Sequence, residues 1–184
     1  AAQAAGVVEA NNYLRALNHA VNAIACLNGP PLTERRYLVD FAVRAEALGH
    51  PGLAAGLQGL LGGPAVDVDR LRGWLSEWHA AYTALPLESA PVSLHPCRLF
   101  YYQRGIAALL EGEHPLHCLW PLWNTWTHLI SALPADSPHR HAWQTAGETL
   151  GLVGEAFPRR VAALDAYLDQ IEEILEAWAR ANGA

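Results

Sequence analysis

The sequence contains no lysine: all 12 of its basic residues are arginine, and methionine is absent as well. Schiff-base formation, phosphate binding by a P-loop lysine and proton transfer by a lysine base each require an amine whose pKa can fall, so the composition excludes these functions. No segment alternates apolar and polar residues in the manner of a half-buried strand either. The chain is therefore expected to be helical and to use side chains other than lysine.

An excess of positive charge is also missing, because the net charge is -6 at pH 7 and the arginines are scattered. Binding to nucleic acid depends largely on neutralising phosphates, so we expect no nucleic-acid partner. The 3 cysteines form no CxxC pair, which favours reduced thiols. Cys26 and Cys118 have apolar neighbours, among which a thiol is usually inert. The start of the chain lacks the basic and apolar regions of a signal peptide, and this favours a cytoplasmic location.

Turn residues divide the chain into segments with a helical spacing of apolar residues. Their ranges are 8–28, 33–48, 52–62, 67–85, 93–112, 114–135, 138–155 and 158–181. The sixth helix begins only at Pro121 if that proline occupies its first turn. With 184 residues, of which 52% are hydrophobic, the chain can bury a sizeable core. We predict an all-α fold, with seven or eight helices in a compact bundle and a single domain over residues 1–184.

The linker 86–95 separates two halves, 1–85 and 95–184, which each read as four helices. Glycines at 52, 56 and 59 recur at the same spacing at 147, 151 and 154, where we expect them to share one helix face. Two duplicated four-helix units, as in a helical repeat, are therefore an alternative description of the bundle. In the last helix we expect a buried stripe opposite an acidic solvated face. The stripe consists of Val161, Leu164, Leu168, Ile171, Leu175 and Trp178.

The segment from His114 to Ala135 contains no Asp, Glu, Lys or Arg, yet it holds three of the tryptophans. It is long enough to span a bilayer, which takes about 20 residues, but its prolines, histidines and other polar residues would be costly in lipid. A helix that is apolar on all sides must be buried on all sides. The sequence therefore predicts a central helix of the bundle and no membrane span.

Within this segment, a polar stripe is formed by His117, Asn124 and His128, which share one helix face with Pro121 between them. Trp120 and Trp123 lie beside it. The stripe predicts a pocket wall, on which aromatic surface and a few polar groups hold a ligand. The alternative is a core helix whose polar groups bond to neighbouring helices, and for His128 taken alone we favour this alternative. The candidate ligand-binding residues are thus His117, Trp120, Trp123, Asn124 and His128.

Two short segments resemble known families. Arg104-Gly105, Leu109 and Gly112, followed by a second helix, are similar to a tetratricopeptide-type hairpin. This resemblance implies a helical scaffold that binds other proteins. The segment Leu75-Ser-Glu-Trp-His79, with His50 upstream, looks like the surroundings of the two haem histidines of globins. That resemblance implies a haem pocket.

Histidines and cysteines are numerous enough for a metal site, but HExxH and the pair of Glu-x-x-His motifs of di-iron bundles are absent. One combination remains, in which His95 or Cys97 meets His128, with His139 or His141 joining them. We expect no resident metal and no cofactor.

These observations favour a non-catalytic helical protein whose cleft, lined by tryptophan and histidine, binds another protein or a small apolar or aromatic ligand. A homodimer is a further expectation. No catalytic residue is assigned, because the sequence has no G-x-S-x-G and no cysteine with an obvious partnered base. The alternative, of a different class, is an enzyme or sensor in which a buried histidine and asparagine site holds a metal, a haem or a small ligand.

Overall fold

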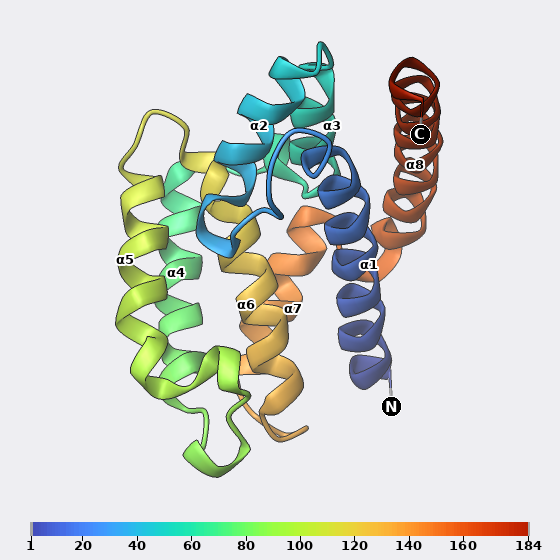
Figure 1. The fold of residues 1–184 in the computed structure, drawn as a ribbon. Helices are drawn as coiled ribbons and strands as arrows, with labels where there is room; N and C mark the ends of the chain where they lie inside the picture. Colours follow the sequence, from blue (N-terminus) through green and yellow to red (C-terminus); the bar gives the residue numbers. More distant parts are fainter. Residues whose placement is uncertain (1, 184) are drawn as a thin grey trace.

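A computed structural model describes residues 2–183, and in this range it contains eight α-helices, short 3₁₀ segments and no strand (Figure 1). The helices are α1 Ala2–Ala25, α2 Tyr37–Ala47, α3 Gly52–Leu60, α4 Val68–Thr83, α5 Leu99–Leu110, α6 Leu119–Ala132, α7 His139–Leu150 and α8 Phe157–Asn182. The predicted all-α bundle is confirmed. Over the described range, no helix combines the length and the apolar character that crossing a membrane requires.

Helix α6 lies at the centre, where it contacts α1, α2, α4, α5 and α7 (Figure 1). Every residue from Leu119 to Thr127 is buried, as are Leu129 and Ile130. Pro121 stands in its first turn, where the missing N–H breaks no helical hydrogen bond. The absence of charge follows from this position, because an unpaired buried charge is strongly destabilising. The prediction of a central helix is confirmed.

Two threonines tie α6 to its neighbours. Trp78 Nε1 of α4 donates to Thr125 Oγ1 at 2.9 Å, and Trp143 Nε1 of α7 donates to Thr127 Oγ1 at 3.1 Å. Each hydroxyl in turn donates to a carbonyl one turn earlier in α6. Polar groups that would be destabilising if unpaired in a core are thereby satisfied, and α4 and α7 are fixed against two nearby positions of one helix.

Three arginines bind the carbonyl groups at helix ends. Arg44 donates to the last carbonyl of α1, Arg140 donates to carbonyls at the end of α6, and Arg160 donates to carbonyls at the ends of α3 and α7. The last four carbonyls of a helix have no partner within it. A guanidinium suits this role because its planar fork can donate to two acceptors at once.

Helix α7 ends at Leu150, before the predicted end near 155, because Gly151 adopts a left-handed φ of 70°. Gly147 lies inside α7, where an added Cβ would come within 2.7 Å of the Trp123 ring. Gly154 has a φ of 71° in the following turn. These three glycines therefore do not share a helix face, and that expectation was wrong. The division of the chain into duplicated halves stays a prediction.

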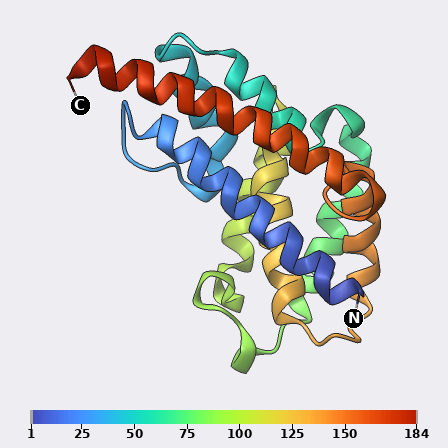
Figure 2. The same cartoon turned by 90° about the vertical axis from the view of Figure 1, so that its right-hand side faces the viewer.

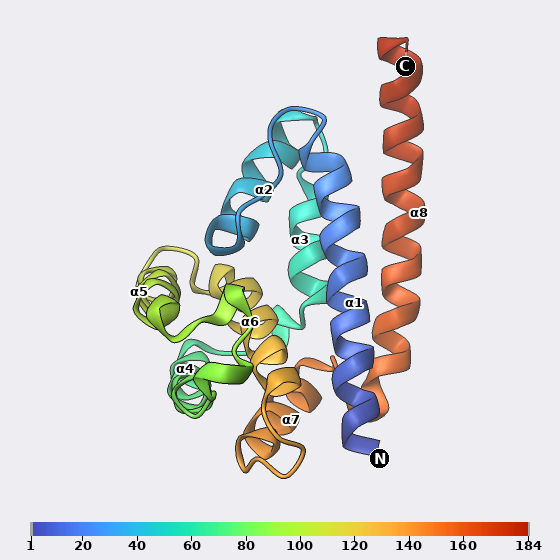
Figure 3. The same cartoon turned by 60° about the horizontal axis from the view of Figure 1, so that its bottom comes forward.

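Helices α1 and α8 lie side by side on one flank and run in the same direction (Figures 2 and 3). The buried residues of α8 are Leu164, Tyr167, Ile171 and Ile174, whereas Val161 is 36% exposed. The predicted stripe was thus wrong at Val161, and it missed Tyr167 and Ile174. The cause is the Tyr167 hydroxyl, which donates to the Leu53 carbonyl at 3.0 Å and turns this face toward α3.

We expect Ile171→Ala, in the buried face of α8, to lower the free energy of unfolding by about 2–5 kcal/mol, since it removes buried methyl groups and leaves a cavity. Glu172→Ala changes the neighbouring exposed residue and should stay within about 0.5 kcal/mol of the wild type. Chemical denaturation measures both values. Equal losses in the two variants would contradict the observed orientation of α8.

Candidate functional site

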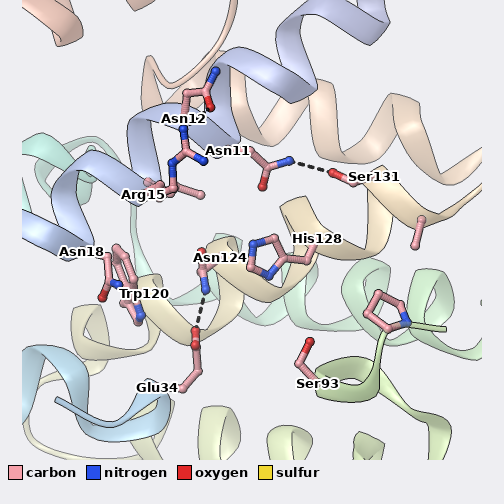
Figure 4. A pocket seen from close by; sticks show the side chains of 13 residues that line it. Asn11, Asn12, Arg15, Asn18, Glu34, Ser93, Trp120, Asn124, His128 and Ser131 are labelled. Atoms are coloured by element: carbon pink, nitrogen blue, oxygen red, sulfur yellow. Dashed lines mark hydrogen bonds between the residues drawn. The ribbon is translucent and has the colours of Figure 1, made fainter. Parts of the chain in front are cut away.

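A cleft of about 770 Å³ opens between α1 and α6 (Figure 4). The 3₁₀ segments η1 (Glu34–Arg36) and η4 (Val92–Leu94) contribute further side chains to its walls. The lining residues are Asn11, Asn12, Leu14, Arg15, Asn18, Glu34, Pro91, Ser93, Trp120, Asn124, His128, Ser131 and Ala132. Most of them are polar, so the cleft offers hydrogen bonds to a ligand beside the apolar surface of Leu14, Pro91 and Ala132.

The cleft interrupts the burial of α6. His128 and Ser131 are the two exposed residues of this helix, and both line the cleft. No residue in the described part of the chain hydrogen-bonds to the His128 ring, so His128 is not the satisfied core histidine that we favoured. The surrounding walls partly desolvate the imidazole and lower the pKa of His128, which favours the neutral form of the ring.

Glu34 brings a carboxylate into the cleft from η1. Asn124 Nδ2 donates to Glu34 Oε1 at 2.9 Å, and this bond links η1 to α6. Burial raises the pKa of the Glu34 carboxyl, and the Asn124 hydrogen bond lowers it by a smaller amount. No cation in residues 2–183 lies within ion-pair distance of Glu34. The cleft thus contains a half-buried acid without a positive partner.

Helix α1 supplies the opposite wall. Asn11 Nδ2 donates to Ser131 Oγ at 2.7 Å, while Asn11 Oδ1 is buried without a partner among the described residues. Arg15 donates to Asn12 Oδ1 at 3.2 Å. Sequence reasoning missed this wall and Glu34. The available signal was the polar stripe of α1, in which Asn11, Arg15 and Asn18 recur at helical spacing.

The structure brings three of the five predicted site residues to the cleft, namely Trp120, Asn124 and His128. Trp120 is almost fully buried, and its ring stacks on Tyr37 with centroids 3.9 Å apart. Trp123 lies in the core, stacked on Trp143 at 5.3 Å. His117 is half-buried in the 3₁₀ segment η6 (Pro115–Cys118), next to the ring of His114. Neither Trp123 nor His117 lines the cleft.

The cleft offers hydrogen bonds and two titratable groups. The pKa of Glu34 is raised and that of His128 is lowered, so burial brings the two values toward each other. Ser131 is already engaged, because its hydroxyl donates to the Thr127 carbonyl and accepts from Asn11. Among the described residues, none of the lining hydroxyls is hydrogen-bonded to a histidine or carboxylate base. The groups of the cleft can offer hydrogen bonds to a ligand.

The predicted metal combination is not assembled in the described range. His95 Nδ1 and Cys97 Sγ lie 3.0 Å apart, but no three His, Cys, Asp or Glu side chains between residues 2 and 183 are grouped for a metal ion. His128 instead faces the cleft. His50 is exposed in the turn after α2, and His79 is half-buried on α4. Neither of these histidines lines the cleft.

The cysteines differ from one another in exposure. Cys118 is buried just before α6, and burial raises the pKa of its thiol to about 12, so the thiol stays protonated and inert. Cys26 was predicted to have apolar surroundings but is exposed. The reason is that α1 ends at Ala25, and Cys26 follows in the turn.

No protein family, curated protein or solved structure that was compared matches the chain. The functional conclusion therefore depends on the chemistry of the cleft.

Glu34→Gln should change how stability depends on pH. A carboxyl whose pKa is higher in the folded than in the unfolded state binds its proton more tightly when folded, so the wild type loses stability as pH rises through that interval. Glutamine does not titrate, and its Oε1 can still accept from Asn124. The free energy of unfolding of Glu34→Gln, relative to the wild type, should therefore increase between about pH 4 and pH 7.

Chemical denaturation across this range tests the expectation, with Glu9→Gln on the exposed face of α1 as the matched control. The titration of His128 is common to all three proteins and cancels in the differences. A difference between Glu34→Gln and the wild type that is constant with pH would show that the Glu34 pKa is not raised.

Proposed function

We propose that this protein is a non-catalytic binding protein, which holds a small polar molecule in the cleft between α1 and α6. The observation that carries the proposal is that polar side chains from four separate elements converge there: Asn11 and Arg15 from α1, Glu34 from η1, Ser93 from η4 and His128 from α6. The volume of about 770 Å³ falls within the range of about 300–1,000 Å³ that is common for small-molecule sites.

Preorganised walls support the proposal. Asn124 is fixed by its hydrogen bond to Glu34, and Asn11 is fixed by its hydrogen bond to Ser131. Trp120 is held by its stack on Tyr37. Side chains that neighbouring groups already hold in place lose little freedom when a ligand binds, which favours affinity. The unpaired Asn11 Oδ1 remains as an acceptor for the ligand.

Asn12→Trp tests the proposal, since this exposed residue lines the cleft and a large ring at its position should obstruct it. Ligand-observed NMR with defined mixtures of amino acids, sugars, diamines and dicarboxylates measures binding. We expect at least one class to bind the wild type and to lose about tenfold or more in affinity in Asn12→Trp. Ala80→Trp, at an exposed position of α4, should bind like the wild type. Equal binding by Asn12→Trp, or no binding by the wild type, would contradict the proposal.

A second candidate function is interaction with another protein through a patch of aromatic and basic residues, formed by Arg35, Phe100, Tyr101 and Arg104 around a groove of about 470 Å³. Phe100 is 66% exposed and Tyr101 is 48% exposed. The guanidinium of Arg35 lies 3.8 Å from the Tyr101 ring centroid, and that of Arg104 lies 5.4 Å from the Phe100 centroid. Exposed aromatic residues together with arginine are typical of protein interfaces.

An acidic segment of a different protein fits this patch better than a second copy of the chain, because a two-fold contact would bring like charges together. We expect a short peptide of alternating aspartate and tryptophan to bind the wild type, with chemical-shift changes at Gly105 in the groove. Arg104→Glu should lower the affinity about tenfold or more, whereas Arg72→Glu on α4 should not. Equal binding by both variants, or no binding by the wild type, would dismiss this candidate.

A further inference from the structure

Hydrogen-bond acceptors face the cleft from two sides. The Glu34 carboxylate lies at the η1 side, and Asn11 Oδ1 is buried and unpartnered at the α1 side (Figure 4). Asn124 donates its amide N–H to Glu34, which leaves its own Oδ1 as an acceptor. A ligand that satisfies these groups must carry N–H or O–H donors, because an acceptor buried against a ligand without a donor reduces affinity.

The negative charge of Glu34 further restricts the class of ligand that the cleft can bind. Arg15 and His128 are the lining residues that can carry positive charge, but Arg15 is exposed and donates to Asn12. Burial lowers the pKa of His128 and so favours its neutral form. Neither side chain forms an ion pair with Glu34 in the described range. A ligand cation would supply the missing partner, and the net charge of -6 attracts cations to the protein.

The aromatic part of the cleft lining excludes quaternary ammonium ions as ligands. Quaternary ammonium groups have no N–H and are recognised by the exposed faces of aromatic rings. Among the described residues that line the cleft, Trp120 is the only Phe, Tyr or Trp, and it is 2% exposed and stacked on Tyr37 at an interplanar angle of 11°. An aromatic cage is therefore not available, and recognition must use N–H groups.

We propose that the cleft binds an organic cation with N–H donors, a primary ammonium or a guanidinium, whose charged group bonds to the Glu34 carboxylate while a second donor reaches Asn11 Oδ1. The inference rests on the proposed function, because it assigns the ligand class of the same cleft. A diamine or an amino-guanidine of short chain length has the required two groups. Glu34 is the residue that confers specificity, and Asn11 and Asn124 position the ligand.

Titration of the ¹⁵N-labelled full chain tests this assignment, with the side-chain amide signals of Asn11 and Asn124 as the readout. The probes are 1,4-diaminobutane, agmatine, butane-1,4-diol, choline and glutarate. We expect the first two to bind at least about tenfold more tightly than the other three. Glu34→Gln should lower the affinity for 1,4-diaminobutane by about tenfold or more. Glu9→Gln makes the same charge change outside the cleft and should not alter it.

Asn11→Ala provides a second variant, independent of the folding of Glu34→Gln. It should weaken 1,4-diaminobutane binding by a smaller factor, because a neutral acceptor contributes less than a charged one. The cation inference is overturned if butane-1,4-diol, choline or glutarate binds as tightly as the amines, if Glu34→Gln binds like the wild type, or if neither amine binds. In each of these cases the proposed function survives only if some other molecule binds the wild type and Asn12→Trp abolishes that binding.

Discussion

The burial of α6 on nearly every side is the constraint on which the rest of the structure depends. A helix in contact with five others excludes water from most of its side chains, so its buried polar groups need partners inside the protein, although the indole N–H groups of Trp123 and Trp126 have none among the described residues. Thr125 and Thr127 meet this requirement by accepting indole N–H groups from α4 and α7 while donating within α6. The same bonds that satisfy the threonines also set where two neighbouring helices lie.

Arginine is the only strongly basic residue in the chain. It too provides hydrogen bonds to polar groups that would otherwise lack a partner. Helix ends that meet in the interior leave carbonyls without partners, and Arg44, Arg140 and Arg160 reach those carbonyls from elsewhere in the chain. A lysine ammonium is a compact, strongly hydrated charge, and it lacks the planar fork that donates in two directions. Lysine would therefore serve less well in this role.

The sequence allowed the all-α fold and the central position of α6 to be predicted, because both follow from periodicity and the absence of charge. Helical spacing also placed Asn124 and His128 on one face, but for His128 alone we favoured a core position, whereas its side chain is exposed in the cleft. The remaining features of the candidate site depend on tertiary contacts. Trp123 belongs to the predicted aromatic surface but is covered by Trp143, and spacing along one helix does not reveal which part of it a neighbour covers. Glu34 lies 90 residues from Asn124 in the chain, so no local pattern connects them.

The cleft itself is more readily explained by binding than by stability. Burial of the Glu34 carboxylate without a cation destabilises the fold, and asparagine is a poor helix former, yet Asn11, Asn12 and Asn18 all lie on one helix of the cleft. Apolar side chains at these positions could close α1 onto α6 and extend a core that already surrounds the site. Natural sequences depart from the residues that would best stabilise their fold chiefly at functional sites. The proposed cation would account together for the polar walls, the acceptor of Asn11 that has no partner among the described residues and the isolated carboxylate, because it would supply donors and a positive charge.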